Sequence, residues 1–177
     1  SLAIDRQALI DNTLSGAGEP AGCWLAPATP GHDDSAKLDY DPEKAKQLLA
    51  EAGVSNLTLD CKIRKGQYEK YMTVIQSYWA EIGVTLNLTV EDSGVWQSDW
   101  ADGNLEVTAL GWFPLYADAD NHMYTYFYSA NAKGKSSFYN NPRVDELLSA
   151  ARVSQDKDER ASLYKEADHI ICHEDFA

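Results

Sequence analysis

The feature that most constrains the fold is an alternation of strand and helix patterns through the middle of the chain. Residues 57–63 and 84–90 alternate apolar and polar side chains with a period of two, which predicts half-buried strands. Residues 67–82 place apolar side chains on one helical stripe. A short helix over 92–101 and an apolar strand over 105–112 complete the series. Strand, helix, strand, helix, strand predicts an α/β fold, a sheet with crossover helices packed on it.

Further helices are predicted on both sides of this central series. Residues 2–14 show helical apolar spacing with no N-cap ahead of them, and an Asp-Pro pair begins a helix that a glycine ends over 42–53. Residues 140–151 and 157–173 repeat the helical pattern. The prolines and glycines of residues 19–40 exclude a long regular element, so we expect a long ordered or functional loop there.

The acidic composition limits the partners that this chain can have. Asp and Glu number 28 against 15 Lys and Arg, a formal charge of -13 that repels phosphate backbones and anionic headgroups. We therefore expect no nucleic-acid partner. No stretch approaches the roughly 18 to 20 apolar residues of a membrane span, so we expect no direct membrane insertion of this segment. A length of 177 residues with 44% hydrophobic residues predicts a single domain over 1–177, cut from something longer.

Cysteine and histidine spacing gives no strong sign of metal or redox chemistry. Cys23, Cys61 and Cys172 lie far apart without a C-x-x-C motif, so one disulfide with one free thiol and three reduced thiols both remain open. His169, Cys172 and His173 share one helical face, but structural metal sites normally need four ligands. We interpret that cluster as a coincidence of composition and predict no metal site and no cofactor. The chain also lacks the motifs of hydrolases and phosphate-binding enzymes, so we predict no catalytic residue.

The best candidate for a binding site is the segment after the last predicted strand. Open α/β sheets bind ligands beyond the carboxyl ends of their strands, and residues 113–121 form a predicted loop at such an end. Trp112, Phe113 and Tyr116 could form an aromatic wall there, with Trp112 nearest the strand. The alternative is that Trp112 is a core residue of the strand and that the loop is a solvated connection.

Two further pairs of side chains have a structural and a functional interpretation. Asp118 and Asp120 fit helix or turn caps better than ligand contacts. Trp96 and Trp100 are four residues apart and share one face of the short helix. Burial of both as core anchors is favoured, and a place in the cleft is the alternative.

Five blocks of sequence, in this order, resemble one known family. They are residues 3–10, 40–53, 76–112, 139–148 and 159–164. The blocks resemble extracytoplasmic solute-binding proteins of the peptide and nickel class, bacterial solute-binding protein family 5, which are the receptors of ABC importers. The resemblance implies a type II periplasmic-binding-protein-like lobe with a mixed β-sheet flanked by helices. It also implies that this domain is most of the C-terminal ligand-binding lobe of a longer two-lobed protein.

The resemblance implies a function without catalysis. The expected role is the substrate-binding component of an ABC importer, which captures an oligopeptide or related small solute between two lobes and delivers it to the permease subunits. The expected location is periplasmic or extracytoplasmic, associated with the cell envelope. Two alternatives stay open, a carboxylate-dependent hydrolase domain and a carrier of nickel or zinc.

One position departs from the family pattern. The loop after the Gly-Trp pair usually carries an acidic residue three positions beyond the Trp, which in peptide binders pairs with the free amino group of the ligand. Here that position is Leu115, and Asp118 and Asp120 match later acidic positions of the loop. The predicted ligand-binding residues are Trp112, Phe113, Leu115, Tyr116, Asp118 and Trp96.

Overall fold

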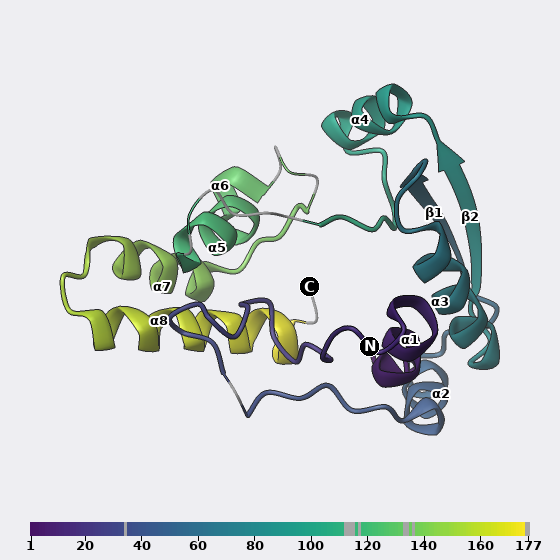
Figure 1. Cartoon of the computed structure of the whole chain (residues 1–177), viewed down its shortest axis with the longest axis horizontal. Helices are drawn as coiled ribbons and strands as arrows, with labels where there is room; N and C mark the ends of the chain where they lie inside the picture. Colours follow the sequence, from purple (N-terminus) through teal and green to yellow (C-terminus); the bar gives the residue numbers. More distant parts are fainter. Residues whose placement is uncertain (34, 112–115, 117, 133–134, 136, 176–177) are drawn as a thin grey trace. The chain divides into compact units, whose positions relative to one another are not determined.

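The computed structural model divides the chain into two compact units, which we call the sheet unit and the helical unit (Figure 1). The sheet unit consists of Ser1–Pro20 and Leu38–Leu110, and the helical unit consists of Ala21–Lys37 and Gly111–Ala177. The residues that the structure describes are 1–33, 35–111, 116, 118–132, 135 and 137–175.

The sheet unit is built around two parallel strands, β1 (Thr58–Arg64) and β2 (Thr85–Glu91). Their register pairs Thr58 with Thr85 and Arg64 with Glu91, so both strands begin and end together. Helix α3 (Glu69–Glu81) is the crossover between them, and α4 (Ser93–Asp102) follows β2 (Figure 1). These four elements confirm the central strand and helix pattern of the sequence.

Over residues 105–111, the described part of the predicted third strand, the prediction is wrong beyond a single position. Val107 is the one residue of this stretch that pairs with β1, through a parallel bridge in which the Lys62 N–H donates to its carbonyl over 3.0 Å. Side chains form hydrogen bonds with the backbone groups that a longer strand pairing would use. The Asp60 N–H donates to Glu106 Oε2 over 2.6 Å, and Thr108 Oγ1 donates to the Lys62 carbonyl over 2.7 Å. Because a backbone group bonded to a side chain no longer needs a strand partner, the ladder stops here.

The core of the sheet unit lies between the strands and α3. Cys61, Ile63 and Leu86 from the strands are almost fully buried, together with Met72 of α3. Ile75 and Trp79, on the helical stripe that the sequence predicted, pack against this cluster. The apolar faces of the two strands and of the amphipathic helix α3 therefore pack together into one small core.

Helix α1 (Arg6–Leu14) begins four residues later than the sequence pattern indicates. Asp5 is its N-cap, and the Asp5 carboxylate accepts a hydrogen bond from the Ala8 N–H over 2.9 Å. The expectation that no N-cap precedes this helix is therefore wrong. The apolar spacing of residues 2–14 concealed the cap, because Asp5 lies inside that run.

Helix α2 (Pro42–Glu51) follows its sequence signals closely. The Asp41 carboxylate accepts from the Lys44 N–H over 2.8 Å, and Pro42 occupies the first turn. Gly53 has a φ of +68°, the left-handed conformation that ends a helix. The predicted boundaries are confirmed to within two residues.

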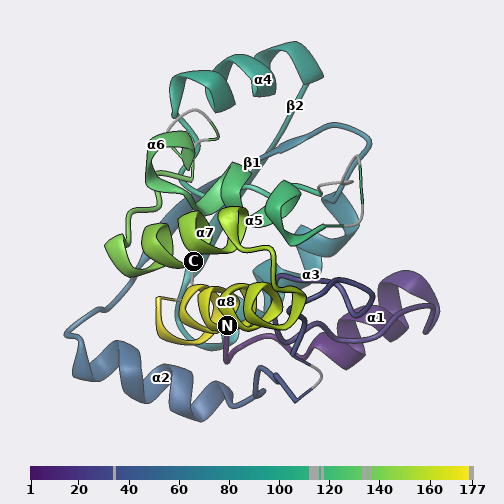
Figure 2. The same cartoon turned by 90° about the vertical axis from the view of Figure 1, so that its left-hand side faces the viewer.

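The helical unit contains α5 (Ala119–Phe127), α6 (Ser129–Ala132), α7 (Pro142–Val153) and α8 (Lys157–His169), and a π-helical turn over Ile170–Glu174 continues α8. Helices α7 and α8 run antiparallel and pack side by side, as both views show (Figures 1 and 2). The sequence predicted α7 and α8 but neither α5 nor α6, and Ala119–Phe127 includes the last residues of the predicted loop 113–121. Among the described residues, no helix has the length and apolar character needed to cross a membrane.

The core of the helical unit joins α5, α7 and α8. Helix α7 buries Val144, Leu147, Leu148 and Ala151. These side chains pack with residues of α5, of α8 and its continuation, and with Leu25. The members are Leu25, Ala119, Met123, Tyr126, Phe127, Val144, Leu147, Leu148, Ala151, Tyr164, Ala167, Ile170 and Ile171. Leu25 belongs to residues 19–40, which we call the proline-rich loop. This loop therefore takes part in the core.

Candidate ligand-binding site

Trp96 anchors α4 to the carboxyl end of the sheet. Its side chain is 3% exposed, and its indole N–H donates to Thr108 Oγ1 over 3.1 Å and to the Lys62 carbonyl over 3.3 Å. The Trp100 ring stacks on it with centroids 5.8 Å apart, which confirms that the two rings share one face. Burial with a satisfied N–H is the behaviour of a core anchor.

Charged side chains gather at the carboxyl end of β1 and β2. Lys62 forms an ion pair with Asp99 of α4 and lies 3.5 Å from Glu91 at the end of β2. The hydrogen bond to Asp99 raises the pKa of Lys62 above its usual value. The Arg64 guanidinium lies 5.6 Å from the Trp96 ring centroid, within range of a cation–π contact. This edge of the sheet therefore carries a cluster of charged side chains beside the buried Trp96 ring.

Asp118 is the N-cap of α5 and is also fixed by a distant arginine. Its carboxylate accepts from the Asp120 N–H, and Arg160 Nη1 and Nη2 donate to its two oxygens over 2.8 Å each. The Arg160 hydrogen bonds lower the pKa of Asp118. The interpretation of Asp118 as a helix cap is confirmed. The sequence did not reveal Arg160 as its partner, because a pairing across 42 residues leaves no local pattern.

Asp120 lies in the first turn of α5 and contacts one residue of α7 and one of α8. Arg152 Nε lies 3.0 Å from Asp120 Oδ1, and the Tyr164 hydroxyl donates to that oxygen over 3.4 Å. The Arg152 guanidinium also lies 3.9 Å from the centroid of the Tyr124 ring. These contacts hold α5 against the other helices and give Asp120 a structural role.

Tyr116 is an exposed aromatic residue of the predicted loop. Its side chain is 53% exposed, and its carbonyl accepts from the Asp118 N–H over 2.9 Å. Trp112, Phe113 and Leu115 lie outside the described residues. The aromatic wall predicted from the sequence therefore stays a prediction.

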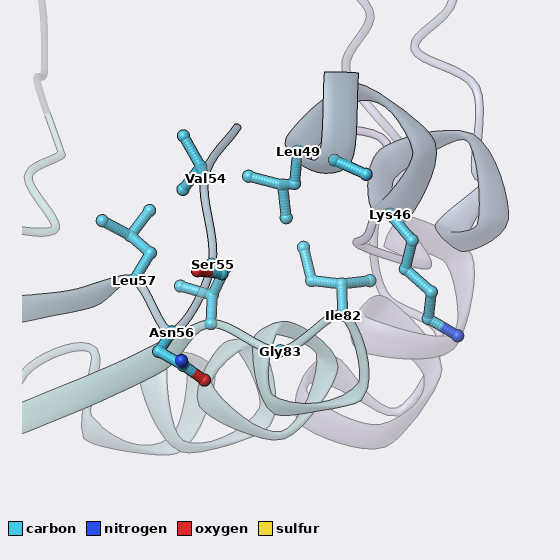
Figure 3. A pocket seen from close by; sticks show the side chains of 10 residues that line it. Lys46, Leu49, Val54, Ser55, Asn56, Leu57, Ile82 and Gly83 are labelled. Carbon is cyan, nitrogen blue, oxygen red and sulfur yellow. The ribbon is translucent and has the colours of Figure 1, made fainter. Parts of the chain in front are cut away.

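A hollow of about 180 Å³ lies in the sheet unit, and its described lining residues include none of the predicted ligand contacts (Figure 3). Leu49 of α2, Val54 and Ile82 give it an apolar wall, and Leu57 and Val84 line it just before β1 and β2 begin. Since the strands are parallel, this is the amino edge of the sheet. Ligands of open α/β sheets bind at the opposite edge, so the hollow is no candidate for the ligand site.

The side chains of His169, Cys172 and His173 form hydrogen bonds and ring contacts with protein groups. The His173 Nε2 donates to the Gly22 carbonyl over 2.9 Å, and Cys172 Sγ donates to Asp168 over 3.6 Å. The His169 and His173 rings stack with centroids 5.1 Å apart. Among the residues that the structure describes, no group of three His, Cys, Asp or Glu side chains is arranged to hold a metal ion.

Comparison with known proteins decides the family. A family model described as bacterial extracellular solute-binding proteins, family 5 Middle, matches residues 1–134. The chain belongs to this family. The resemblance drawn from the five sequence blocks is thereby confirmed. Family members are binding proteins rather than enzymes.

Individual relatives agree with the family assignment. The chain is 34% identical to heme-binding protein A of Haemophilus influenzae, over 96% of this chain and 32% of that protein. It is 30% identical to the dipeptide-binding protein of Escherichia coli K12, over 97% of this chain and 34% of that protein. The chain thus spans about a third of the length of the curated relatives it matches.

A solved structure confirms the fold class. The periplasmic binding protein DppA of Helicobacter pylori, in complex with the peptide STSA, matches 96% of this chain and 34% of its own chain with a TM-score of 0.89 and 29% identity. The fold is therefore the α/β fold of type II periplasmic-binding proteins. The described strands and the bridge at Val107 are parallel to each other.

Proposed function

We propose that this chain is part of the substrate-binding component of an ABC importer, which captures a peptide or related small solute and delivers it to the membrane permease. The observation that carries the proposal is the family match over residues 1–134. Relatives named for binding dipeptides, glutathione and heme support it. The proposed location of the whole protein is periplasmic or extracytoplasmic, and the proposed mechanism is closure of two lobes around the ligand.

The proposed ligand site uses the loop that follows the sheet unit. Trp112, Phe113 and Tyr116 are the proposed aromatic contacts, and Tyr116 has the exposure that such a contact requires. Trp96 and Asp118 complete the proposed set by holding the chain on either side of that loop. Trp96 fixes Thr108 before the loop through the indole N–H, and Asp118 caps the helix that follows.

Leu115 makes the proposal more specific. A leucine cannot form the charge-assisted hydrogen bond that an acidic residue at this position would offer to an α-amino group, a contact worth about 1.5 to 3 kcal/mol. The proposed ligand is therefore one whose recognition does not depend on a free amino group at this position. N-blocked or modified peptides fit that description, and so do related solutes without an α-amino group.

Calorimetry on the full-length protein tests this proposal. A free peptide and its N-acetyl form are titrated into the wild type and into Leu115→Asp, with Leu48→Asp as the control. Leu48 is 43% exposed on α2, so the control adds the same charge outside the loop. Leu115→Asp should tighten binding of the free peptide roughly 10- to 100-fold over the N-acetyl form, and the control should change neither. A wild type that already prefers the free peptide tenfold would contradict the assigned role of Leu115.

A further inference from the structure

Two segments of the helical unit that are far apart in the sequence are joined by polar contacts around one buried carboxylate. Asp168 of α8 is 1% exposed, and it accepts from the Trp24 N–H over 2.9 Å and from the Leu25 N–H over 3.2 Å. His173 Nε2 donates to the Gly22 carbonyl over 2.9 Å. The start of the proline-rich loop therefore lies directly on the last turns of the chain (Figure 1).

Each of these two segments carries a thiol beside the same carboxylate. Cys172 Sγ lies 3.6 Å from Asp168 Oδ1, the oxygen that also accepts from the Trp24 N–H. Cys23 immediately precedes Trp24 and is 9% exposed. Asp168 Oδ1 thus contacts both the Cys172 sulfur and the N–H of the peptide group that joins Cys23 to Trp24. Hydrogen bonds on both sides of Cys23, at Gly22 and at Leu25, hold its segment against the segment that carries Cys172.

We propose that Cys23 and Cys172 are a redox pair that forms a disulfide and ties the proline-rich loop to the π-helical turn. Both are free thiols in the structure. The oxidant is a second disulfide, either a small molecule such as oxidised glutathione or the disulfide of a thiol oxidase. One cysteine thiolate attacks a sulfur of that disulfide and releases a thiol. The second cysteine then attacks the mixed disulfide, so the protein loses two protons and two electrons and the oxidant gains them as two thiols.

The proline-rich loop is tightly folded beside Cys23. A Cβ on Gly22 would lie 2.1 Å from the Ala36 carbonyl oxygen, so only glycine fits beside Cys23. A Cβ on Gly31 would lie 2.9 Å from Tyr164 Cβ, so the same loop also presses on α8 further along. The loop is therefore packed against itself beside Cys23 and against α8 before any bond forms. In the reduced state the Cys23 thiol donates to the Leu25 carbonyl over 3.4 Å, a contact that the disulfide replaces.

Cys61 is the natural internal control. It is fully buried in β1 of the sheet unit, among the apolar residues of that core. Burial raises the pKa of Cys61 to about 11, and burial beside Asp168 raises that of Cys172 to about 12. Since a thiolate is the attacking species, the thiols of the folded reduced protein should react more slowly than those of the unfolded chain. The bond should therefore form as the chain folds.

Peptide mapping under non-reducing conditions tests the pairing. The full chain is refolded in a mixture of reduced and oxidised glutathione, its free thiols are alkylated in denaturant, and its peptides are weighed. We expect one linked pair, Cys23 with Cys172, that is lighter by two hydrogen atoms, with Cys61 alkylated. Cys61→Ser should keep the link and Cys172→Ser should lose it. Alkylation of all three cysteines, a link through Cys61, or a stable glutathione adduct at Cys172 would each overturn the proposal.

Thermal unfolding gives a second measurement that does not depend on mapping. The oxidised wild type should unfold about 5 to 10 °C above the same protein treated with dithiothreitol, the usual effect of a native disulfide in a chain of this length. Cys61→Ser should keep this difference, and Cys23→Ser should unfold at one temperature with or without the reductant. Equal midpoints for oxidised and reduced wild type would contradict a bond that fits the native structure.

Discussion

The two units of this chain are stabilised in different ways. The sheet unit buries a small apolar cluster between two strands and the helix that connects them, so its contacts follow the local pattern of the sequence. The helical unit has the larger core and also uses polar contacts between distant residues, such as Asp168 with Trp24 and Arg160 with Asp118. Periodicity alone therefore specifies the first unit well and the second incompletely.

The largest expected effect is the loss of the buried carboxylate. Asp168→Ala leaves the buried Leu25 N–H and the part-buried Trp24 N–H without this acceptor and should lower the free energy of unfolding of the helical unit by about 3 to 5 kcal/mol. Asp60→Ala is the matched change in the sheet unit. It removes an exposed contact with Asn87 and should cost less than about 1 kcal/mol. Amide hydrogen exchange resolves both units, and equal losses for the two variants would contradict the comparison.

A pair of glycine substitutions sharpens the same comparison. Gly31 and Gly53 both have positive φ values, so alanine is strained at either position. An added Cβ meets Tyr164 and the Ala161 carbonyl at Gly31, and nothing within 4 Å at Gly53. We expect Gly31→Ala to cost about 2 to 4 kcal/mol and Gly53→Ala about 1 kcal/mol in denaturant melts. Similar costs would mean that the loop does not press on α8.

Trp96 tests how far the sheet unit also depends on a polar contact. Trp96→Phe removes the indole donor to Thr108 and leaves a small cavity, and it should cost about 2 kcal/mol. Val95→Ala, at a residue 55% exposed on the same helix, should stay within about 0.5 kcal/mol. Thermal melts followed by near-ultraviolet circular dichroism measure both variants. A neutral Trp96→Phe would show that the indole N–H has no structural role.

The smallest expected effect is electrostatic and depends on pH. Because Arg160 lowers the folded-state pKa of Asp118, the stabilisation from this pair is complete above the unfolded pKa of about 3.9 and is lost as the pH falls through the lowered value. Asp118→Asn keeps an N-cap acceptor and should cost about 1 kcal/mol at pH 7.

The difference between Asp118→Asn and the wild type should shrink toward zero in urea melts carried out below pH 4. Asp156→Asn is the control, since the described hydrogen bonds of the Asp156 side chain are to the amides of Asp158 and Glu159. A cost of Asp118→Asn that stays constant down to the lowest pH would mean that the carboxylate charge contributes nothing.

Much of the fold could be predicted because its signals are local. The Asp-Pro start of α2 and the alternation in β1 and β2 act within a few residues, and the structure confirms them. Helix α5 escaped prediction because its aromatic residues, Tyr126 and Phe127 among them, become helical by packing into a core made by α7 and α8. The length of the third strand was predicted too long. The apolar character of its residues does not show where side chains will form hydrogen bonds with backbone groups in place of a neighbouring strand.

The candidate site could be predicted in part for the same reason. The capping role of Asp118 and the shared face of Trp96 and Trp100 follow from spacing alone, and the structure confirms both. The arginine that fixes Asp118 and the lysine that pairs with Asp99 come from distant parts of the chain, so no local pattern announces them.

The central proposal is that this chain is part of a protein that holds a small solute without converting it. Mass spectrometry of the full-length protein, purified without denaturation and then extracted with organic solvent, tests it most directly. The account predicts a peptide or related solute recovered unchanged and in proportion to the protein, with less recovered from Tyr116→Ala. Recovery of no solute, together with turnover of added peptide into hydrolysis products, would contradict it.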